Sequence, residues 1–506
     1  MWIPTVKRRE NSVPVLLLAM LLMCGIPPSA PAQSYRIVDT GVHTFYNNIA
    51  VIAAPSQNEA FYGQDAHYEG MQPAYTDNGD GTVTDEVTGL MWQKDMGPKI
   101  SFAAAHVKAD TMTLGGYHDW RIPTIKEMYS LILFTGKVKG ESAIKAFIDT
   151  TVFIQPLGDT SIGEREIDAQ TWSSTRYRGL TFQRDSTVFG VNFIDGRIKG
   201  YPLYKPGTGT ARPNLMYFRM VRGNTAYGVN DFVDNGDGSI TDNATGLMWQ
   251  QSDDGVARDW EHALEYAEQA TIAGYTDWRL PDIKELQSIV DYSRCPQATG
   301  SAALDPIFTT TSINDPDGRP GHYPFFWSST THLDGANPYA SAAYVAFGEA
   351  LGKMNNTVMD VHGAGAQRSD PKAGDAQAYP QFFGPQGDVR YVYNYVRCVR
   401  TVGGTSGAAD NPVLPERNIL EQNFPNPATS ATTIPFRLTN SGAISLTVHD
   451  LLGRQIATVM EGTAAAGSHS AILRTERFPA GLYFYRLRSE TETLTRCMII
   501  APQSGN

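Results

Sequence analysis

A basic and aromatic stretch between residues 176 and 222 carries the side chains best suited to bind a ligand. Guanidinium groups match the geometry of sulphate and carboxylate, and aromatic rings cover the faces of sugars, so this composition favours a sulphated or uronic glycan. The alternative is a solvated sheet face whose charges pair elsewhere. The candidate glycan-binding residues are Arg176, Tyr177, Arg178, Arg184, Arg197, Lys199, Tyr201 and Lys205.

Two Asp-rich segments, DNGDG at 77–81 and again at 234–238, could supply hard oxygen ligands to calcium. Their spacing differs from that of an EF-hand loop. Asn-Gly and Asp-Gly also form turns, and the residues around them alternate as in a β-hairpin. We favour the structural turn and keep calcium as the alternative. The candidate calcium ligands are Asp77, Asp80, Asp85, Asp234, Asp237 and Asp242.

The sequence contains no complete catalytic constellation. It lacks a G-x-S-x-G nucleophile elbow, an H-E-x-x-H zinc motif, a P-loop and a C-x-x-C pair. We therefore predict a protein without catalytic residues, and without a cofactor unless calcium binds.

The Asp-rich segments belong to a long internal repeat. DNGDGTVTDEVTGLMWQ at residue 77 corresponds to DNGDGSITDNATGLMWQ at residue 234, and three further blocks follow in the same order. They are GYHDWRIPTIKEM and GYTDWRLPDIKEL, TWSST and FWSST, and YFRMVR and YVRCVR. Ordered blocks with little drift indicate two tandem copies, copy one (66–224) and copy two (225–403), each expected to bury its own core.

Residue periodicity within each copy predicts two helices beside a small antiparallel sheet, an α+β domain. Helical spacing occupies 101–112 and 259–272, and again 123–133 and 281–293 after a proline. The tryptophans that the copies share are expected in the core, and Arg121 and Arg279 in buried ion pairs or backbone caps rather than in a ligand clamp. These tryptophans are Trp92, Trp249, Trp120, Trp278, Trp172 and Trp327.

Cys295 and Cys398 occur only in copy two, and copy one has Lys137 and Met220 at the aligned positions. A bonded pair would be present or absent together, so we predict a Cys295–Cys398 disulfide. It would close a loop of about 100 residues and stabilise the fold by several kcal/mol. The alternative is two independent buried thiols.

The two copies differ in charge and in one insertion. Residues 66–224 contain 18 Lys or Arg and 17 Asp or Glu, whereas residues 225–403 contain 11 and 23. Copy two also has a long insertion between FWSST and YVRCVR, for which we favour a flexible surface loop over a site for metal or neutral sugar. Ligand binding is expected where the copies differ. The polar residues singled out in and near the insertion are His332, Asp334, Asp360, His362, Asp370 and Asp388.

Taken together, the four blocks resemble the Lcl C-terminal family, the C-terminal domains of collagen-like bacterial adhesins. The resemblance covers both copies, about residues 69–402. It implies two tandem domains with folds related to C-type-lectin-like and formylglycine-generating-enzyme-like domains, and a role in surface adhesion and glycan binding. Formylglycine-generating chemistry needs a nearby cysteine pair, and only Cys398 stands in the matching region, which argues against that activity.

Residues 418–506 follow a Gly-, Pro- and Ala-rich linker (404–417) and alternate as strands do. They predict an all-β, immunoglobulin-like sandwich. The phrases LEQNFPNPATSATTIPFRL, HDLLGRQIATV and PAGLYFYRL closely resemble the C-terminal sorting domain of the type IX secretion system. This resemblance implies that the type IX machinery is a partner, and that the protein is secreted or reaches the outer-membrane cell surface.

The first 32 residues have the pattern of an export signal. Lys7, Arg8 and Arg9 precede a short apolar core, and Ala30-Pro31-Ala32 forms a small-x-small cleavage site. The apolar core is short for a membrane span, so no transmembrane segment is expected in the mature chain. Residues 33–65 remain unassigned.

These observations favour a secreted or cell-surface, non-catalytic binding protein, an adhesin for a glycan or extracellular matrix ligand. The alternative is a structural protein that self-assembles at the surface or in the matrix, and an exported enzyme is the weaker hypothesis. Nucleic acid is a poorer partner for the basic stretch, because the protein is expected to be exported.

Overall fold

The computed structural model describes residues 34–501, except 139–143, 206–207, 209, 211, 375–376, 403–417, 421–422, 424–425, 439–440, 465–466 and 490–491. The predicted export signal (1–32) and the predicted linker (404–417) lie outside the described residues.

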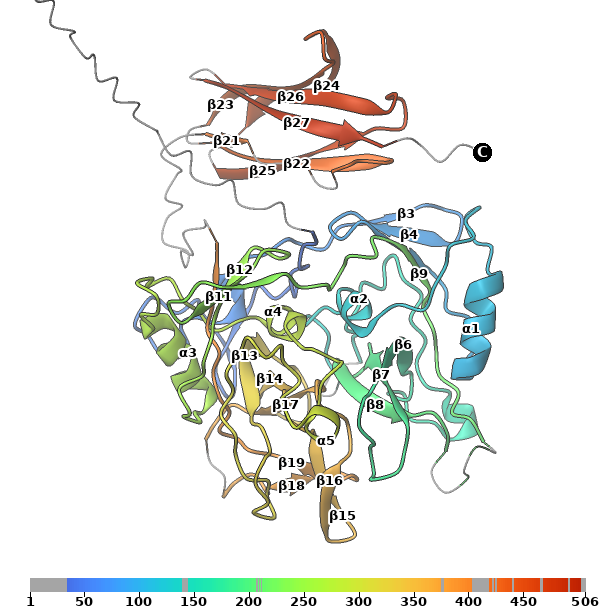
Figure 1. Ribbon diagram of the computed structural model, residues 1–506, viewed down its shortest axis with the longest axis vertical. Helices are drawn as coiled ribbons and strands as arrows, with labels where there is room; N and C mark the ends of the chain where they lie inside the picture. The colour runs from blue at the N-terminus through green and yellow to red at the C-terminus, as the bar shows by residue number, and fades with distance from the viewer. Residues whose placement is uncertain are drawn as a thin grey trace, which may run out of the picture. The chain divides into compact units, whose positions relative to one another are not determined.

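Strands dominate the fold, and the predicted α+β class is wrong. Strands make up 37% of the structure that is described and helices 10%, and the strands form several small antiparallel sheets (Figure 1). Nothing in this arrangement supports the expected C-type-lectin-like or formylglycine-generating-enzyme-like fold. The helices of the two copies are α1 (Phe102–Thr111), α2 (Ile125–Tyr129), α3 (Trp260–Gln269), α4 (Ile283–Ser288) and α5 (Pro296–Thr299).

The helices α2 and α4 are shorter than their sequence pattern predicts. Each begins at a capping box, Thr124 with Glu127 and Asp282 with Glu285. The apolar residues beyond them, such as Ile132, are buried in non-helical chain. The spacing of these apolar residues therefore indicates that they are buried, not that they are helical.

Each copy contains one four-stranded sheet that brings its first and last repeat blocks together. In both sheets the tryptophan of the GLMWQ block lies opposite the first valine of the closing strand, as in the pairs Trp92–Val221 and Trp249–Val399. The strands run in the order given. Copy one has β3 (Tyr75–Asp77), β4 (Thr82–Asp85), β5 (Leu90–Gln93) and β9 (Val221–Gly223), and copy two has β10 (Phe232–Asp234), β11 (Ser239–Asp242), β12 (Leu247–Gln250) and β20 (Val399–Thr401).

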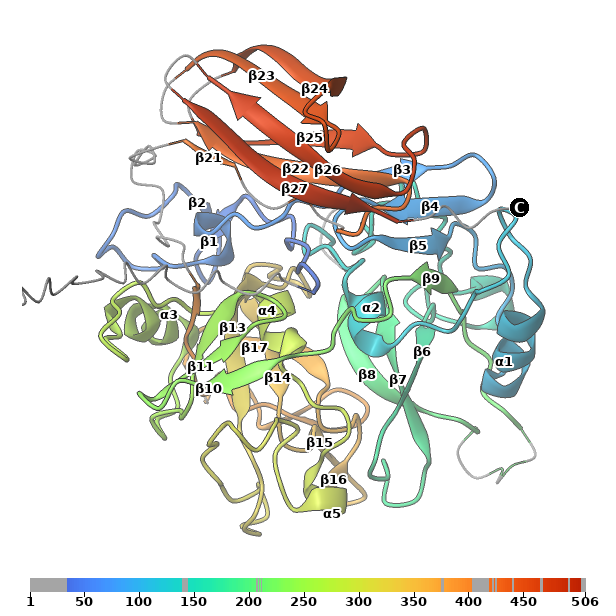
Figure 2. The same ribbon diagram turned by 45° about the horizontal axis from the view of Figure 1, so that its top comes forward.

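A six-stranded sheet joins the two copies (Figures 1 and 2). Equivalent strands β8 and β17 meet antiparallel at its centre, with Ile198 opposite Gln367. The copies are therefore related by an approximate twofold rotation. In order, the strands are β13 (Phe325–Thr331), β14 (Ser341–Ala346), β17 (Gln367–Pro371), β8 (Arg197–Pro202), β7 (Thr187–Asn192) and β6 (Thr171–Arg176).

The core crosses the same junction. One hydrophobic cluster contains Phe189 and Val191 of copy one together with Phe326 and Val345 of copy two. Each copy also has a cluster of its own, around Trp172 in copy one and Trp327 in copy two, so the expectation of one core per copy misses the core that the copies share. The repeat pattern shows that two segments of the chain are similar, but it does not show the strand edge at which they join.

Two equivalent lysines make reciprocal contacts across this junction. Lys126 Nζ donates to the carbonyl of Ser288 at 2.6 Å, and Lys284 Nζ donates to that of Ser130 at 2.9 Å. Burial lowers the pKa of both lysines to about 8. The lysine of the IKE sequence in each copy thus caps the helix region of the other copy.

Residues 34–65, left unassigned by sequence, pack largely on copy two together with the first residues of copy one, up to residue 70. Asp65 accepts a hydrogen bond from Thr330 Oγ1 at 2.6 Å, and the Tyr68 hydroxyl donates to Glu268. The segment also supplies a carbonyl to a buried lysine, since Lys284 Nζ donates to Asp39 O at 3.0 Å. Its short elements are β1 (Phe45–Tyr46), β2 (Val51–Ile52) and the 3-10 helix η1 (Asp65–His67).

The insertion of copy two is structured, which corrects the expectation of a flexible surface loop. It forms an antiparallel sheet and places Asp360 and His362, 3% and 2% exposed, in the interior. The strands, in sheet order, are β16 (Thr357–Asp360), β15 (Leu351–Met354), β19 (Asp388–Val389) and β18 (Phe382–Phe383).

The C-terminal region consists of two antiparallel sheets around one core that contains Phe436, Leu446 and Tyr485. One sheet has the order β21 (Ile419–Leu420), β22 (Ala431–Leu438) and β25 (Gly467–Arg474). The other has the order β24 (Gln455–Ala464), β23 (Gly442–His449), β26 (Gly481–Arg488) and β27 (Thr493–Ile500).

Candidate functional site

The exposed members of the predicted glycan-binding set lie in copy one. Arg176, Arg178, Arg184 and Lys205 are exposed. The Arg176 guanidinium lies 4.8 Å from the centre of the Phe102 ring, whereas Arg184 has only a long, 3.9 Å contact with Asp185.

The other four predicted residues, Tyr177, Arg197, Lys199 and Tyr201, are buried or half-buried. Three of them lie on β8, at the junction with copy two. The structure therefore does not bring the eight side chains together on one surface.

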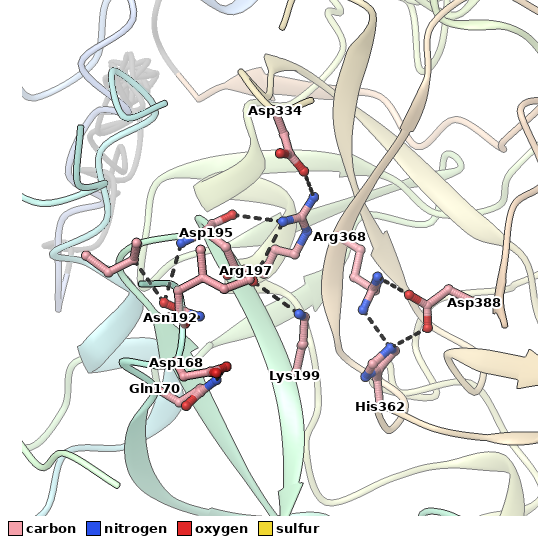
Figure 3. A network of polar contacts seen from close by, with 12 residues as sticks. Asp168, Gln170, Asn192, Asp195, Arg197, Lys199, Asp334, His362, Arg368 and Asp388 are labelled. Carbon is pink, nitrogen blue, oxygen red and sulfur yellow. Dashed lines mark hydrogen bonds and ion pairs between the residues drawn. The ribbon is translucent and has the colours of Figure 1, made fainter. Parts of the chain in front are cut away.

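Charged side chains form a network where β8 meets β17 (Figure 3). Arg197 Nη2 donates to Asp334 Oδ2 at 2.5 Å and to Ser369 Oγ at 3.3 Å, and Lys199 Nζ donates to Asp195 Oδ2 at 3.1 Å. Burial opposes ionisation of Asp334, but the Arg197 guanidinium outweighs it and lowers the pKa of Asp334 to about 2. Arg197 and Asp334 are thus both charged at neutral pH, and their charges cancel.

Three residues of copy two complete the network (Figure 3). Arg368 Nη2 donates to Asp388 Oδ2 at 2.5 Å, and His362 Nε2 lies 2.6 Å from Arg368 Nη1 and 2.8 Å from Asp388 Oδ1. Burial, with Arg368, lowers the pKa of His362 to about 3. The imidazole is therefore neutral at physiological pH and fixes the positions of its neighbours rather than transferring protons.

A cleft of about 320 Å³ opens on this network, and we call it the Arg390 cleft. The Arg390 guanidinium lies 4.2 Å from the centre of the Phe383 ring and 5.5 Å from that of Tyr379. Phe383 is 56% exposed. The polar and aromatic side chains that line the cleft include Arg197, Asp334, Asn337, Ser341, Arg368, Asp370, Tyr379, Phe383, Asp388 and Arg390.

The candidate calcium ligands of copy one are engaged in hairpin turns. Asp77 Oδ2 lies 2.5 Å from Lys94 Nζ, and Asp80 Oδ1 accepts from the hydroxyl of Thr82 at 2.6 Å. Asp85 is buried and accepts from the backbone N–H groups that follow it.

The candidate ligands of copy two have the same roles. Asp234 accepts from the N–H of Gly236, Asp237 accepts from Ser239, and buried Asp242 accepts from Asn230. Within the described part of the chain, no three His, Cys, Asp or Glu side chains are arranged to hold a metal ion.

The predicted Cys295–Cys398 disulfide is not formed. Both thiols are free and buried. Cys295 is the N-cap residue of α5 and belongs to the core shared by the copies, whereas Cys398 packs in a different cluster with Trp260 and Trp278. Burial raises the pKa of both thiols. Their joint absence from copy one reflects two separate core positions, not a bond.

The repeated blocks correspond to a known family. A family model described as the Lcl C-terminal domain matches residues 81–222 and 238–362, which together are more than half of the chain. The chain belongs to the Lcl C-terminal domain family.

The sheets beyond residue 418 match a second family model, described as a secretion system C-terminal sorting domain, at residues 422–501. This type IX sorting tail indicates export to the cell surface or outer membrane. Among the described residues, no helix has both the length and the apolar character needed to span a membrane.

No curated protein matches the chain. Among solved structures, PorZ of Porphyromonas gingivalis, described as an essential bacterial surface component of the type-IX secretion system, is 9% identical. The match covers 67% of this chain and 45% of that chain, so this chain spans less than half of PorZ. The TM-score of 0.13 supports no inference about a shared fold.

The shared motif residues of the two Lcl C-terminal domains are structural. The six shared tryptophans are at most 4% exposed, which confirms that they are core. Arg121 and Arg279 form ion pairs with Glu127 and Glu285 at 2.5 and 2.6 Å, which confirms the predicted ion pairs; the pair of copy two is buried, whereas Arg121 is half-buried. Both glutamates also close the capping boxes, so the DWR and IKE motifs form one unit.

Sequence reasoning missed the side chains that make the Arg390 cleft distinctive. Arg368, Tyr379, Phe383 and Arg390 all come from the insertion of copy two. A signal was present, because the segment YPQFFGPQGDVRYVY (379–393) interleaves arginine with aromatic residues. Because copy two is acidic overall, a basic and aromatic binding site was not expected there.

Proposed function

We propose that this Lcl-family surface protein is a non-catalytic glycan-binding adhesin and that the Arg390 cleft receives the sugar. The observation that supports this proposal most is the pairing of an exposed aromatic ring, Phe383, with the Arg390 guanidinium in a cleft that is also lined by ion-paired polar groups. Among the described residues, no carboxylate lies within ion-pair distance of Arg390.

The ion-paired polar groups that line the cleft suit the hydroxyl groups of a sugar. The Arg197–Asp334 and Arg368–Asp388 pairs hold donors and acceptors at fixed positions, and their charges cancel. Asp370 also lines the cleft and feels the charge of Arg390, but it is only 2% exposed, so Arg390 is the cation placed to attract a carboxylate or sulphate on the glycan. The volume of about 320 Å³ lies at the lower end of the range of small-ligand sites. One or two sugar units would fit.

A glycan array probed with the chain from residue 33 onward, at low and high salt, tests this proposal. We expect binding of uronic or sulphated glycans that weakens as salt rises, because salt screens the attraction between the guanidinium and the charged group of the glycan. Phe383→Ala and Arg390→Ala should each weaken binding about tenfold or more, as for residues that carry most of an interface.

Arg178→Ala is the matched control, because Arg178 is exposed in copy one and lies outside the cleft. Loss of binding in Arg178→Ala but not in Arg390→Ala would place the site on copy one instead. If no glycan is bound by the folded protein, the structural, self-assembling role replaces the adhesin.

A further inference from the structure

A second cleft, of about 270 Å³, lies elsewhere in copy two, and we call it the acidic cleft. Its lining includes His322, Glu349 and Asp360 of copy two and Gln183 of copy one. None of its lining residues belongs to the Arg390 cleft. The two clefts can therefore be tested independently.

A strained turn of copy one contributes to the lining of this cleft. Phe182 N donates to Asp360 O at 2.8 Å, and Leu180 N donates to Gln297 Oε1 at 2.8 Å. Phe182 and Gln183 have φ angles of 51° and 63°, a left-handed conformation that non-glycine residues rarely adopt. Strained backbone of this kind concentrates at ligand sites. Here it holds Gln183 at the cleft.

Two buried polar atoms at the cleft have no hydrogen-bond partner. Asp360 is 3% exposed; its Oδ1 accepts from Gly363 N at 2.7 Å, but its Oδ2 accepts from no described group. His322 is 4% exposed, and its Nε2 is also unpaired. The Tyr177 hydroxyl faces Asp360 and favours its ionised form, yet no hydrogen bond of ordinary geometry joins them. Buried polar groups are nearly always paired, so unpaired ones point to a ligand.

The cleft has an excess of negative charge. Arg319 is its one cationic lining residue, and it is engaged by Asp315 Oδ2 at 2.6 Å and by the carbonyl of Val358 at 3.0 Å. Among the described residues, no cation lies within ion-pair distance of Asp360 or Glu349, although the charge of Arg319 also acts on Glu349. Burial, and next the charge of Glu349, raise the pKa of Asp360 to about 7. A cation in the cleft would relieve this repulsion.

The ligand geometry favours an organic cation. Within the described residues, no three potential ligands are arranged for a metal. The exposed side-chain amide of Gln183 instead offers hydrogen bonds suited to a hydroxyl group, whereas the Gln297 amide is already paired with the backbone of Leu180. We propose that the acidic cleft binds the protonated amine of an amino sugar, with Asp360 and Glu349 holding the ammonium group and Gln183 holding a hydroxyl.

Calorimetric titration of the chain from residue 33 onward with a glucosamine tetrasaccharide tests the proposal. The N-acetylated tetrasaccharide, which lacks the charge, is the chemical control. We expect the amine form to bind at least tenfold more tightly. Asp360→Asn should remove that preference, and Gln183→Ala should weaken binding several-fold without a change in folding.

Asp65→Asn is the matched variant, because Asp65 is an equally buried carboxyl whose pKa is also raised to about 7, but it lies in neither cleft. It should bind like the parent protein. No binding, equal binding of both tetrasaccharides, or unchanged binding by Asp360→Asn and Gln183→Ala would each overturn the proposal. Equal competition by a lysine peptide would overturn the assignment to a sugar.

Discussion

At the scale of the residue, Asp65 is a carboxyl buried among groups that disfavour its charge. It is 4% exposed and accepts hydrogen bonds from the hydroxyls of Thr40 and Thr330. Burial, and then the charge of Asp39, raise the pKa of Asp65 to about 7. The native state therefore binds a proton that the unfolded chain, with an ordinary pKa of about 4, releases.

This difference predicts a stability that falls as pH rises. The folded state binds more protons than the unfolded state between the two pKa values, so the contribution of Asp65 is greatest below pH of about 4 and is lost by pH of about 7. Asp65→Asn should match the parent protein at low pH and exceed it at pH 8, by a few kcal/mol at about 1.4 kcal/mol per pKa unit. Urea unfolding from pH 4 to 8 measures this difference. Parallel curves for the two proteins would contradict it.

At the scale of the element, buried arginines of the closing motif tie strand ends to loops. Arg397 Nη1 donates to the carbonyls of Gln250 and Gln251 at 2.8 and 2.6 Å, and its Nη2 donates to that of Thr309 at 2.9 Å. Arg219 has the same role in copy one, with the carbonyls of Gln93 and Ile154. The arginine is repeated because each copy must satisfy the carbonyls at the end of its GLMWQ strand.

Removal of this arginine should destabilise the molecule strongly. Arg397→Met keeps most of the side-chain volume but removes the donor from three carbonyls, those of buried Gln250, half-buried Gln251 and exposed Thr309, and the cation beside the buried side chain of Asp253. Because a buried group left unsatisfied costs about 1–3 kcal/mol, and more when it is charged, we expect a loss of roughly 3 kcal/mol in the free energy of unfolding. Chemical denaturation measures it, with exposed Arg178→Met as the control. A loss no larger than that of the control variant would show that water replaces the guanidinium as the donor to these carbonyls.

At the scale of the whole molecule, the two copies are one folding unit. The six-stranded sheet, the shared core and the contacts of residues 34–70 with copy two all cross the repeat boundary. Each copy exposes, when alone, a sheet edge and apolar residues that the other copy covers. Both candidate clefts also contain a residue of copy one, Arg197 or Gln183.

Copy two expressed alone (225–403) should therefore be unstable. We expect it to aggregate or to melt well below the segment 33–403, because it lacks the β8 edge and also lacks Asp65 and Asp39, which accept hydrogen bonds from its buried Thr330 and Lys284. Thermal unfolding followed by circular dichroism compares the two. Equal melting temperatures would show that the copies fold independently.

The amino-acid sequence by itself determined the repeated blocks, the buried tryptophans, the ion-paired arginines Arg121 and Arg279, and the sorting tail. These features are local, because a strand, a cap or a turn depends on residues a few positions apart. Only the tertiary structure decided that β8 pairs with β17, that Arg197 meets Asp334 across 137 positions, and that residues of the insertion help to line two clefts. Such contacts join residues far apart in the chain, so no local pattern predicts them. The tertiary structure also placed Cys295 and Cys398, present together in one copy, in different hydrophobic clusters.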